Sequence, residues 1–121
     1  MLNEILISIS LALSQLSIEL EKRETVGIVQ EFPGFANLPV AFQKTIICES
    51  GGRQFNSKGK VLISPTKDKG ILQINSKIHE KNALKMGHDI NTLEGNLAYG
   101  WWLYQHGGLK HWVCAKRLGF I

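Results

Sequence analysis

The chain has 121 residues, of which 44% are apolar and 20% charged, a balance typical of one small globular domain and unlike that of a disordered chain. The net charge of +4 is uneven: residues 1–30 carry four glutamates against Lys22 and Arg23, a net of −2, which leaves +6 for residues 31–121. The basic residues are scattered singly, without an arginine-rich run or interleaved aromatic residues. This pattern argues against a nucleic-acid partner and favours another anionic polymer, such as a bacterial cell wall, or an anionic lipid.

Residues 1–37 are predicted to be an apolar segment followed by a connector. The apolar segment is too short and too interrupted by serines for a stable membrane span. Its length fits a secretory signal peptide, which would place the protein in the cell envelope, the periplasm or outside the cell, although Glu4 lies where lysine or arginine is usual. The alternative is a helix that packs on the domain, because apolar residues recur at helical spacing. Neither interpretation places chemistry in this segment.

A first helix is predicted from Pro39 to Glu49. Proline suits the first turn of a helix, and the apolar residues Val40, Phe42, Ile46 and Ile47 are expected to form its buried face. The following Ser50-Gly51-Gly52 ends the helix, because glycine adopts the left-handed cap conformation without steric cost. One carboxylate, that of Glu49, is therefore expected at a helix end beside a loop.

The next segment is expected to form the second wall of a cleft. A polar turn at residues 56–59 predicts a short hairpin or an extended loop. After Gly70, the side chains of Ile71, Leu72 and Ile74 are expected to point inward, whereas Gln73 and Asn75 present amides; Asn75 is the better candidate for a structural role or a helix cap.

Two longer helices and a short one are predicted in the rest of the chain. Residues 76–86 form a lysine-rich helix that ends at Gly87. The sequence from Asn91 to Glu94 has the form of a capping box and begins a helix that ends at Gly107. A last short helix is expected from Leu109. The pattern predicts a mainly α fold.

Three motifs in order resemble those of the SLT-type lytic transglycosylases within the lysozyme-like superfamily. They are Cys48-Glu49-Ser50-Gly51-Gly52, then Gly70 to Asn75, then Asn96-Leu97-Ala98-Tyr99-Gly100 with Tyr104 beyond. The resemblance covers roughly residues 38–112, and although each motif alone is weak, their order and spacing are fairly specific.

The resemblance implies an α+β lysozyme-like domain over residues 38–121, mainly helical, with a short hairpin or extended loop flanking the cleft. Such a domain cleaves the bond between N-acetylmuramic acid and N-acetylglucosamine in the glycan strands of peptidoglycan, gives 1,6-anhydro-muramic products and needs no metal or organic cofactor. Glu49 takes the position of the catalytic acid and Ser50 that of the serine which orients it. The other implied substrate-binding positions are Gln73, Asn96, Tyr99 and Tyr104.

One departure from the family pattern concerns the region after the third motif. Many members carry a Tyr-Asn-Ala-Gly motif there, whereas this chain has residues 110–115 with the sequence Lys-His-Trp-Val-Cys-Ala. The expectation is that Trp112 or a nearby aromatic residue closes the groove, or that the chain is truncated.

The chemistry leaves three functions open. A general acid must hold its proton near neutral pH, and an apolar pocket achieves this by raising the pKa of Glu49. Hydrolysis by two carboxylates needs a second acid in the groove, and the domain offers few: Asp68, Asp89, Glu80 and Glu94. Glu80 fits a solvated helix face and Glu94 a helix cap, and Asp68 is the only acid close in sequence to a cleft motif. The scarcity of partner acids favours the transglycosylase route. The alternatives are a muramidase, and a non-catalytic peptidoglycan-binding, phage or secretion-system module.

The cysteines and histidines add little to this function. Cys48 and Cys114 form either one disulfide or two buried thiols. The four histidines fit no metal template and are interpreted as surface or helix-end residues. A monomer is expected, although the sequence does not determine the oligomeric state.

Overall fold

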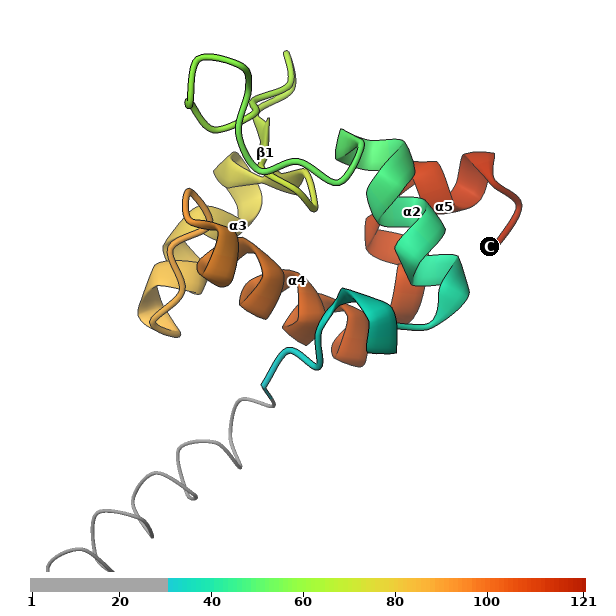
Figure 1. Cartoon of the computed structure of the whole chain (residues 1–121). Coiled ribbons are helices and arrows are strands. Elements are labelled where there is room, and N and C mark those ends of the chain that lie inside the picture. The colour runs from blue at the N-terminus through green and yellow to red at the C-terminus, as the bar shows by residue number, and fades with distance from the viewer. Residues whose placement is uncertain (1–30) are drawn as a thin grey trace, which may run out of the picture. The chain divides into compact units, whose positions relative to one another are not determined.

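The structure, a computed structural model, describes residues 31–121, so the predicted signal peptide or packing helix lies outside the described residues. Residues 32–121 form one compact unit (Figure 1). Its elements in chain order are the 3-10 helix η1 (Phe35–Asn37), helix α2 (Val40–Ser50), strands β1 (Asp68–Lys69) and β2 (Ile74–Asn75), helices α3 (Ser76–Lys85) and α4 (Leu93–Gly107), the 3-10 helix η2 (Gly108–His111) and helix α5 (Val113–Arg117). The predicted mainly helical α+β composition is confirmed. Within residues 31–121, no helix has the length and apolar character needed to cross a bilayer.

Helix α2 has the predicted ends but not the predicted buried face. It follows Pro39 and is capped by Gly51 in the left-handed conformation, with φ of 67°. Phe42 and Ile46 are fully buried, whereas Val40 and Ile47 are 63% and 53% exposed. Residues seven apart lie on the same side of a helix, so Val40 and Ile47 share the face that points away from the core.

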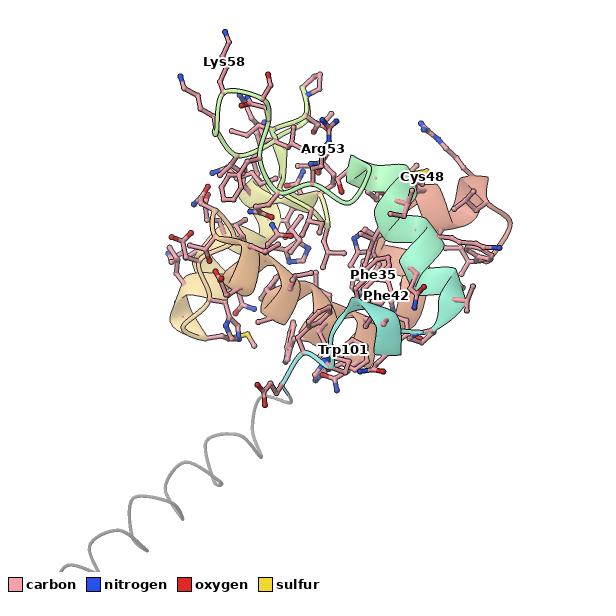
Figure 2. All side chains as sticks on the ribbon, in the orientation of Figure 1. Phe35, Phe42, Cys48, Arg53, Lys58 and Trp101 are labelled. Carbon is pink, nitrogen blue, oxygen red and sulfur yellow. A yellow bond between two sulfur atoms is a disulfide. The ribbon has the colours of Figure 1, made fainter. Side chains whose placement is uncertain are left out.

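The core combines aliphatic and aromatic side chains, and several of its aromatic rings gather beside α4. The ring of Phe42 stacks on Tyr104 of α4, with 4.7 Å between ring centroids, and lies 5.0 Å from the ring of Trp112. Trp101 stacks on Tyr104 from the same helix, and Figure 2 shows Phe42 and Trp101 on the side of the unit where η1 lies. Helix α2 packs against α5, and Figure 1 shows the two side by side.

The segment between α2 and α3 is an extended loop that ends in a two-stranded antiparallel sheet. Isolated bridges pair Phe55 with Val61 and Ile63 with Lys69. Strands β1 and β2 pair Asp68 with Asn75 and Lys69 with Ile74. The predicted burial of Ile71, Leu72 and Ile74 is confirmed.

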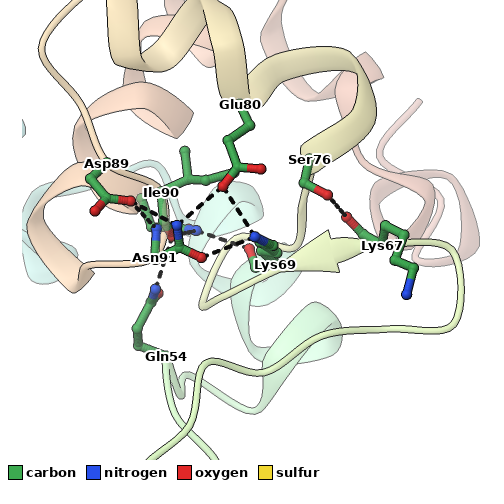
Figure 3. A network of polar contacts seen from close by, with 9 residues as sticks. Gln54, Lys67, Lys69, Ser76, Glu80, Asp89, Ile90 and Asn91 are labelled. Atoms are coloured by element: carbon green, nitrogen blue, oxygen red, sulfur yellow. Dashed lines mark hydrogen bonds and ion pairs between the residues drawn. The ribbon is translucent and has the colours of Figure 1, made fainter.

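Asn75 begins α3 as its N-cap, because its side chain accepts a hydrogen bond from the Ile78 N–H. The N-cap of α4 is Thr92, which accepts from the Gly95 N–H, so the prediction that Asn91 caps this helix is wrong by one residue. Figure 3 shows the Asn91 amide donating to the Glu80 carboxylate, which also forms a 3.1 Å ion pair with Lys69. Glu80 therefore joins three segments and is not merely a solvated residue.

The chain after α4 differs from the predicted single helix. Helix η2 comes first, and α5 follows after Trp112, whose backbone is extended. This break turns the indole of Trp112 inward, where its Nε1–H donates to the Leu72 carbonyl at 2.8 Å.

Glycine allows α4 to approach the second wall closely. A Cβ atom at Gly100 would overlap the side chain of Leu72, and one at Gly70 would overlap Asn96 and Gln54. The glycines of the second and third motifs are thus explained by close packing between these two segments.

Candidate active site

Glu49 lies on the last turn of α2 and is half-buried. Its Oε1 accepts a hydrogen bond of 3.1 Å from the Cys114 backbone N–H at the start of α5. Cys48, the preceding residue, forms a disulfide with Cys114, which settles the question that the sequence left open, and the two Cα atoms lie 6.0 Å apart. The disulfide and the hydrogen bond together fix the carboxylate against α5.

The environment of Glu49 favours its protonated form. Burial raises the pKa of this carboxyl group above its ordinary value, and the negative charge of Asp68 raises it further. The Cys114 N–H and the charge of Arg117 act in the opposite direction without cancelling the rise. A carboxyl group of this kind is suited to donating a proton.

A cavity of about 270 Å³ adjoins Glu49, and we call it the acid cavity. Its lining includes the carboxylates of Glu49 and Asp68, the aromatic rings of His111 and Trp112, and residues at the start of α5. The full set is Glu49, Ser64, Thr66, Asp68, Gln73, His111, Trp112, Val113, Cys114 and Arg117. The predicted cleft between the end of α2 and the second wall is therefore present, and Trp112 lies in its lining.

Asp68, in the same cavity, is held in its ionised form. Burial by itself raises the pKa of Asp68, but hydrogen bonds from Thr66, Ser64 and Asn75 outweigh burial and lower the pKa below its ordinary value. Ser64 and Thr66 both donate to Oδ2, and the Asn75 amide donates to Oδ1 at 3.0 Å. The acid cavity thus contains two carboxyl groups whose pKa values are shifted in opposite directions.

A second cavity, of about 250 Å³, continues the groove, and we call it the His79 cavity. It shares Asp68, Gln73, His111 and Trp112 with the acid cavity. Its remaining lining residues are Ile74, Asn75, Ile78, His79 and Leu103. The two cavities therefore form one groove long enough for more than a single small group.

Gln73 and Glu49 are the predicted site residues that line this groove. Gln73 has a φ of 48°, in the left-handed region that is unfavourable for a side chain, and its Nε2 donates to the Gly70 carbonyl at 2.8 Å. This backbone conformation and the hydrogen bond fix the amide side chain between the two cavities.

The other predicted site residues do not line the groove: they are Ser50, Asn96, Tyr99 and Tyr104. The Ser50 hydroxyl donates to the Ile71 carbonyl at 2.7 Å and accepts from backbone N–H groups of the following turn, so it joins α2 to the second wall. The implied role of orienting Glu49 falls instead to the Cys114 N–H.

Asn96 holds the second wall from the other side. Its amide donates to the Lys69 and Ile90 carbonyls and accepts from the Leu72 N–H, all within 3.0 Å. Tyr99 is 1% exposed and hydrogen-bonds to the His79 ring, whereas Tyr104 stacks on Phe42 in the core. Any effect of these side chains on a ligand is therefore indirect.

The structure adds residues that the sequence did not indicate. His79 and His111 line the groove. The interpretation as surface or helix-end residues holds for His111, which is exposed at the end of η2, but not for His79, which is half-buried within α3. Gln54 is buried, accepts from the Ile71 N–H at 2.8 Å and donates to the Ile90 carbonyl at 3.1 Å, as Figure 3 shows for the second bond. These residues come from separate loops and helices, and their spacing in the sequence carries no signal.

Among residues 31–121, no group of three or more histidine, cysteine, aspartate or glutamate side chains is arranged to hold a metal ion. Comparison of the chain with protein-family models, with curated proteins and with solved structures found no match.

Proposed function

We propose that the protein is a lysozyme-like glycosidase that hydrolyses the glycan strands of peptidoglycan. Glu49 acts as the general acid that protonates the leaving glycosidic oxygen, and ionised Asp68 is its partner. The observation that carries this proposal is the pair itself: two carboxyl groups in one cavity, one with a raised pKa and the other with a lowered pKa.

Asp68 changes the balance between the two routes that the sequence leaves open. The scarcity of partner acids in the sequence favours the transglycosylase route, whereas the acid cavity has Asp68, the one acid near a cleft motif, in its lining together with Glu49. An ionised carboxylate there can stabilise the positive charge that develops on the sugar ring, or act directly as nucleophile or base. Hydrogen bonds from three side chains keep it ionised, as either role requires.

The choice of peptidoglycan rests on charge and on the motif resemblance. The net charge of +6 on residues 31–121 attracts an anionic polymer, and the groove is lined by many polar side chains, which suits the hydroxyl groups of a sugar. The three ordered motifs resemble those of enzymes that cleave the bond between N-acetylmuramic acid and N-acetylglucosamine in peptidoglycan.

Lytic transglycosylation remains the second candidate because those motifs resemble that family. In this route Glu49 keeps its role as the acid, and the O6 hydroxyl of the muramic acid displaces the leaving sugar to give a 1,6-anhydro product. Asp68 is then dispensable for bond cleavage.

Product analysis separates the candidates. Purified peptidoglycan is digested with the wild-type chain and with Asp68→Asn, and the soluble products are identified by mass spectrometry. Hydrolysis predicts reducing-end products, together with a fall in kcat of about 100- to 1,000-fold in Asp68→Asn. Products that carry only 1,6-anhydro ends, formed at an unchanged rate by Asp68→Asn, would establish the transglycosylase instead. Wall binding without any product would indicate a binding module.

A further inference from the structure

The buried hydroxyl of Tyr99 connects α4 to the His79 cavity. Tyr99 is 1% exposed, so its hydroxyl depends on protein partners. It has two, both on α3: the Nδ1 atom of His79 at 2.9 Å and the Nδ2 atom of Asn82 at 3.2 Å. The rings of Tyr99 and His79 lie 5.5 Å apart between centroids.

The direction of each hydrogen bond follows from the chemistry of the partners. The Asn82 amide nitrogen also donates to the Met86 sulfur at 3.8 Å, and a thioether can only accept, so this end of the amide is the nitrogen. The Tyr99 oxygen therefore accepts from Asn82, and its own proton is left to donate. The acceptor within reach is Nδ1 of His79.

This arrangement selects one tautomer of His79. If Nδ1 carried a hydrogen, the Tyr99 hydroxyl proton would be buried without an acceptor, which is unfavourable. Nδ1 is therefore unprotonated in the neutral ring, and the hydrogen lies on Nε2. Burial lowers the pKa of His79, and the nearby His111 lowers it further, so the ring is neutral at pH 7.

The ring of His79 lines its cavity together with Asp68 and the apolar side chains of Ile74, Ile78 and Leu103. The apolar side chains suit the C–H faces of a sugar, and the ring supplies a hydrogen-bond donor. An anionic group is disfavoured there because Asp68 is already ionised. The cavity is thus matched to an uncharged hydrogen-bond acceptor.

We propose that the Nε2–H of His79 donates a hydrogen bond to an uncharged oxygen of the bound glycan, and that Tyr99 is the positioning residue that fixes this tautomer. The oxygen belongs either to a hydroxyl group or to the carbonyl of an acetamido group. The proposal rests on the proposed function, since it concerns how the same groove holds its substrate.

The tautomer is tested first, in the free protein. Long-range proton–nitrogen correlation spectra of the full chain carrying Glu49→Gln, at neutral pH, are expected to show His79 with an unprotonated Nδ1 and a protonated Nε2. Tyr99→Phe removes the donor to Nδ1 and is expected to move the Nδ1 resonance of His79 while leaving that of His106 in place. The opposite tautomer in the Glu49→Gln chain would overturn the proposal, whatever the catalytic activity.

Binding is tested next in the same Glu49→Gln background. The probe is an oligomer of N-acetylglucosamine, compared with its de-N-acetylated counterpart. His79→Ala is expected to raise Kd for the first oligomer about 3- to 10-fold, and Tyr99→Phe by a smaller factor. An effect confined to the acetylated oligomer identifies the carbonyl as the acceptor, whereas an equal effect on both identifies a hydroxyl.

The matched control is His106→Ala, which removes the same side chain from an exposed position on α4 and is expected to leave Kd unchanged. His79→Gln, which retains an N–H donor, replaces the alanine variant if thermal unfolding shows that alanine disrupts the fold. A Kd unaltered by His79 substitution overturns this proposal alone. Absence of both binding and wall cleavage in the wild-type chain would overturn the proposed function as well.

Discussion

Glu49 and Asp68 show how two residues of similar chemistry acquire different properties from their surroundings. Glu49 has one backbone N–H as its hydrogen-bond donor and is half-buried beside another negative charge. Asp68 receives three side-chain hydrogen bonds, which favour the charged form. The same groove therefore favours the protonated form of one carboxyl group and the ionised form of the other.

The pH dependence of activity follows from these opposite shifts. Glu49 must be protonated, so the rate falls as pH rises through its pKa, which lies above the ordinary 4.5. Asp68 must be ionised, so the rate falls as pH drops through its pKa, which lies below the ordinary 3.8. A profile of kcat/KM against pH is expected to be bell-shaped between these limits. A rate that keeps rising towards alkaline pH would contradict the role of Glu49.

Among the residues of the site, the sequence could indicate Glu49 and Gln73, because a carboxylate at a helix end and an amide among buried aliphatic residues are local patterns. It could not indicate His79 or His111, because the tertiary fold brings them from α3 and from η2 into one cavity with Asp68 of β1. The position of Asp68 beside a cleft motif makes it a candidate from the sequence alone. Its hydrogen-bonded environment became visible only in the structure.

At the scale of elements, the second wall depends on polar side chains that bond to its backbone from three sides. Ser50, Gln54 and Asn96 bond to the backbone of residues 69–72 from α2, from the loop and from α4. Short strands cannot fix such a segment, because β1 and β2 have two residues each. The buried amides take over part of the role that a larger sheet would have.

Asn96→Ala is therefore expected to lower the free energy of unfolding by about 2–5 kcal/mol, because it leaves buried backbone groups of the second wall without partners. Urea unfolding measures this change. The control is Asn37→Ala, whose exposed amide donates to the Pro33 carbonyl, and it is expected to change stability by less than about 0.5 kcal/mol. Equal effects of the two substitutions would contradict the proposed support of the wall.

The ends of α2 were predictable and its buried face was not. Pro39 and Gly51 act through local backbone geometry, and the predicted ends of α2 follow from them. The exposure of Val40 and Ile47 depends on which side of α2 meets the core, which the sequence of the helix alone does not determine. The cap of α4 was misplaced for a similar reason, since the Asn91 side chain bonds to Glu80 and Asp89.

At the scale of the whole described unit, the disulfide joins the helix that carries Glu49 to the last helix of the chain. Cys48 and Cys114 are 66 residues apart in sequence. In the chain-entropy model, closing a loop of this length stabilises the folded state by about 4 kcal/mol. The disulfide also places the Cys114 N–H against the Glu49 carboxylate.

Replacing both cysteines by serine is expected to lower the free energy of unfolding by about 4 kcal/mol and to reduce kcat in the fraction that stays folded. Urea unfolding and rate measurements check the two effects, and reduction of the wild-type chain with dithiothreitol is expected to reproduce them. Unchanged stability and activity would mean that the disulfide supports neither the fold nor the position of Glu49.

The central claim, that Glu49 is the acid of a glycan-cleaving site, is tested most directly by the rate at which wild type and Glu49→Gln release soluble fragments from purified peptidoglycan. Glutamine keeps the size of the side chain and an oxygen for the Cys114 N–H, but its amide cannot transfer a proton as a carboxylic acid does. The account predicts that Glu49→Gln binds peptidoglycan as tightly as wild type and cleaves it about 100- to 10,000-fold more slowly. Cleavage by Glu49→Gln at the wild-type rate would contradict the account.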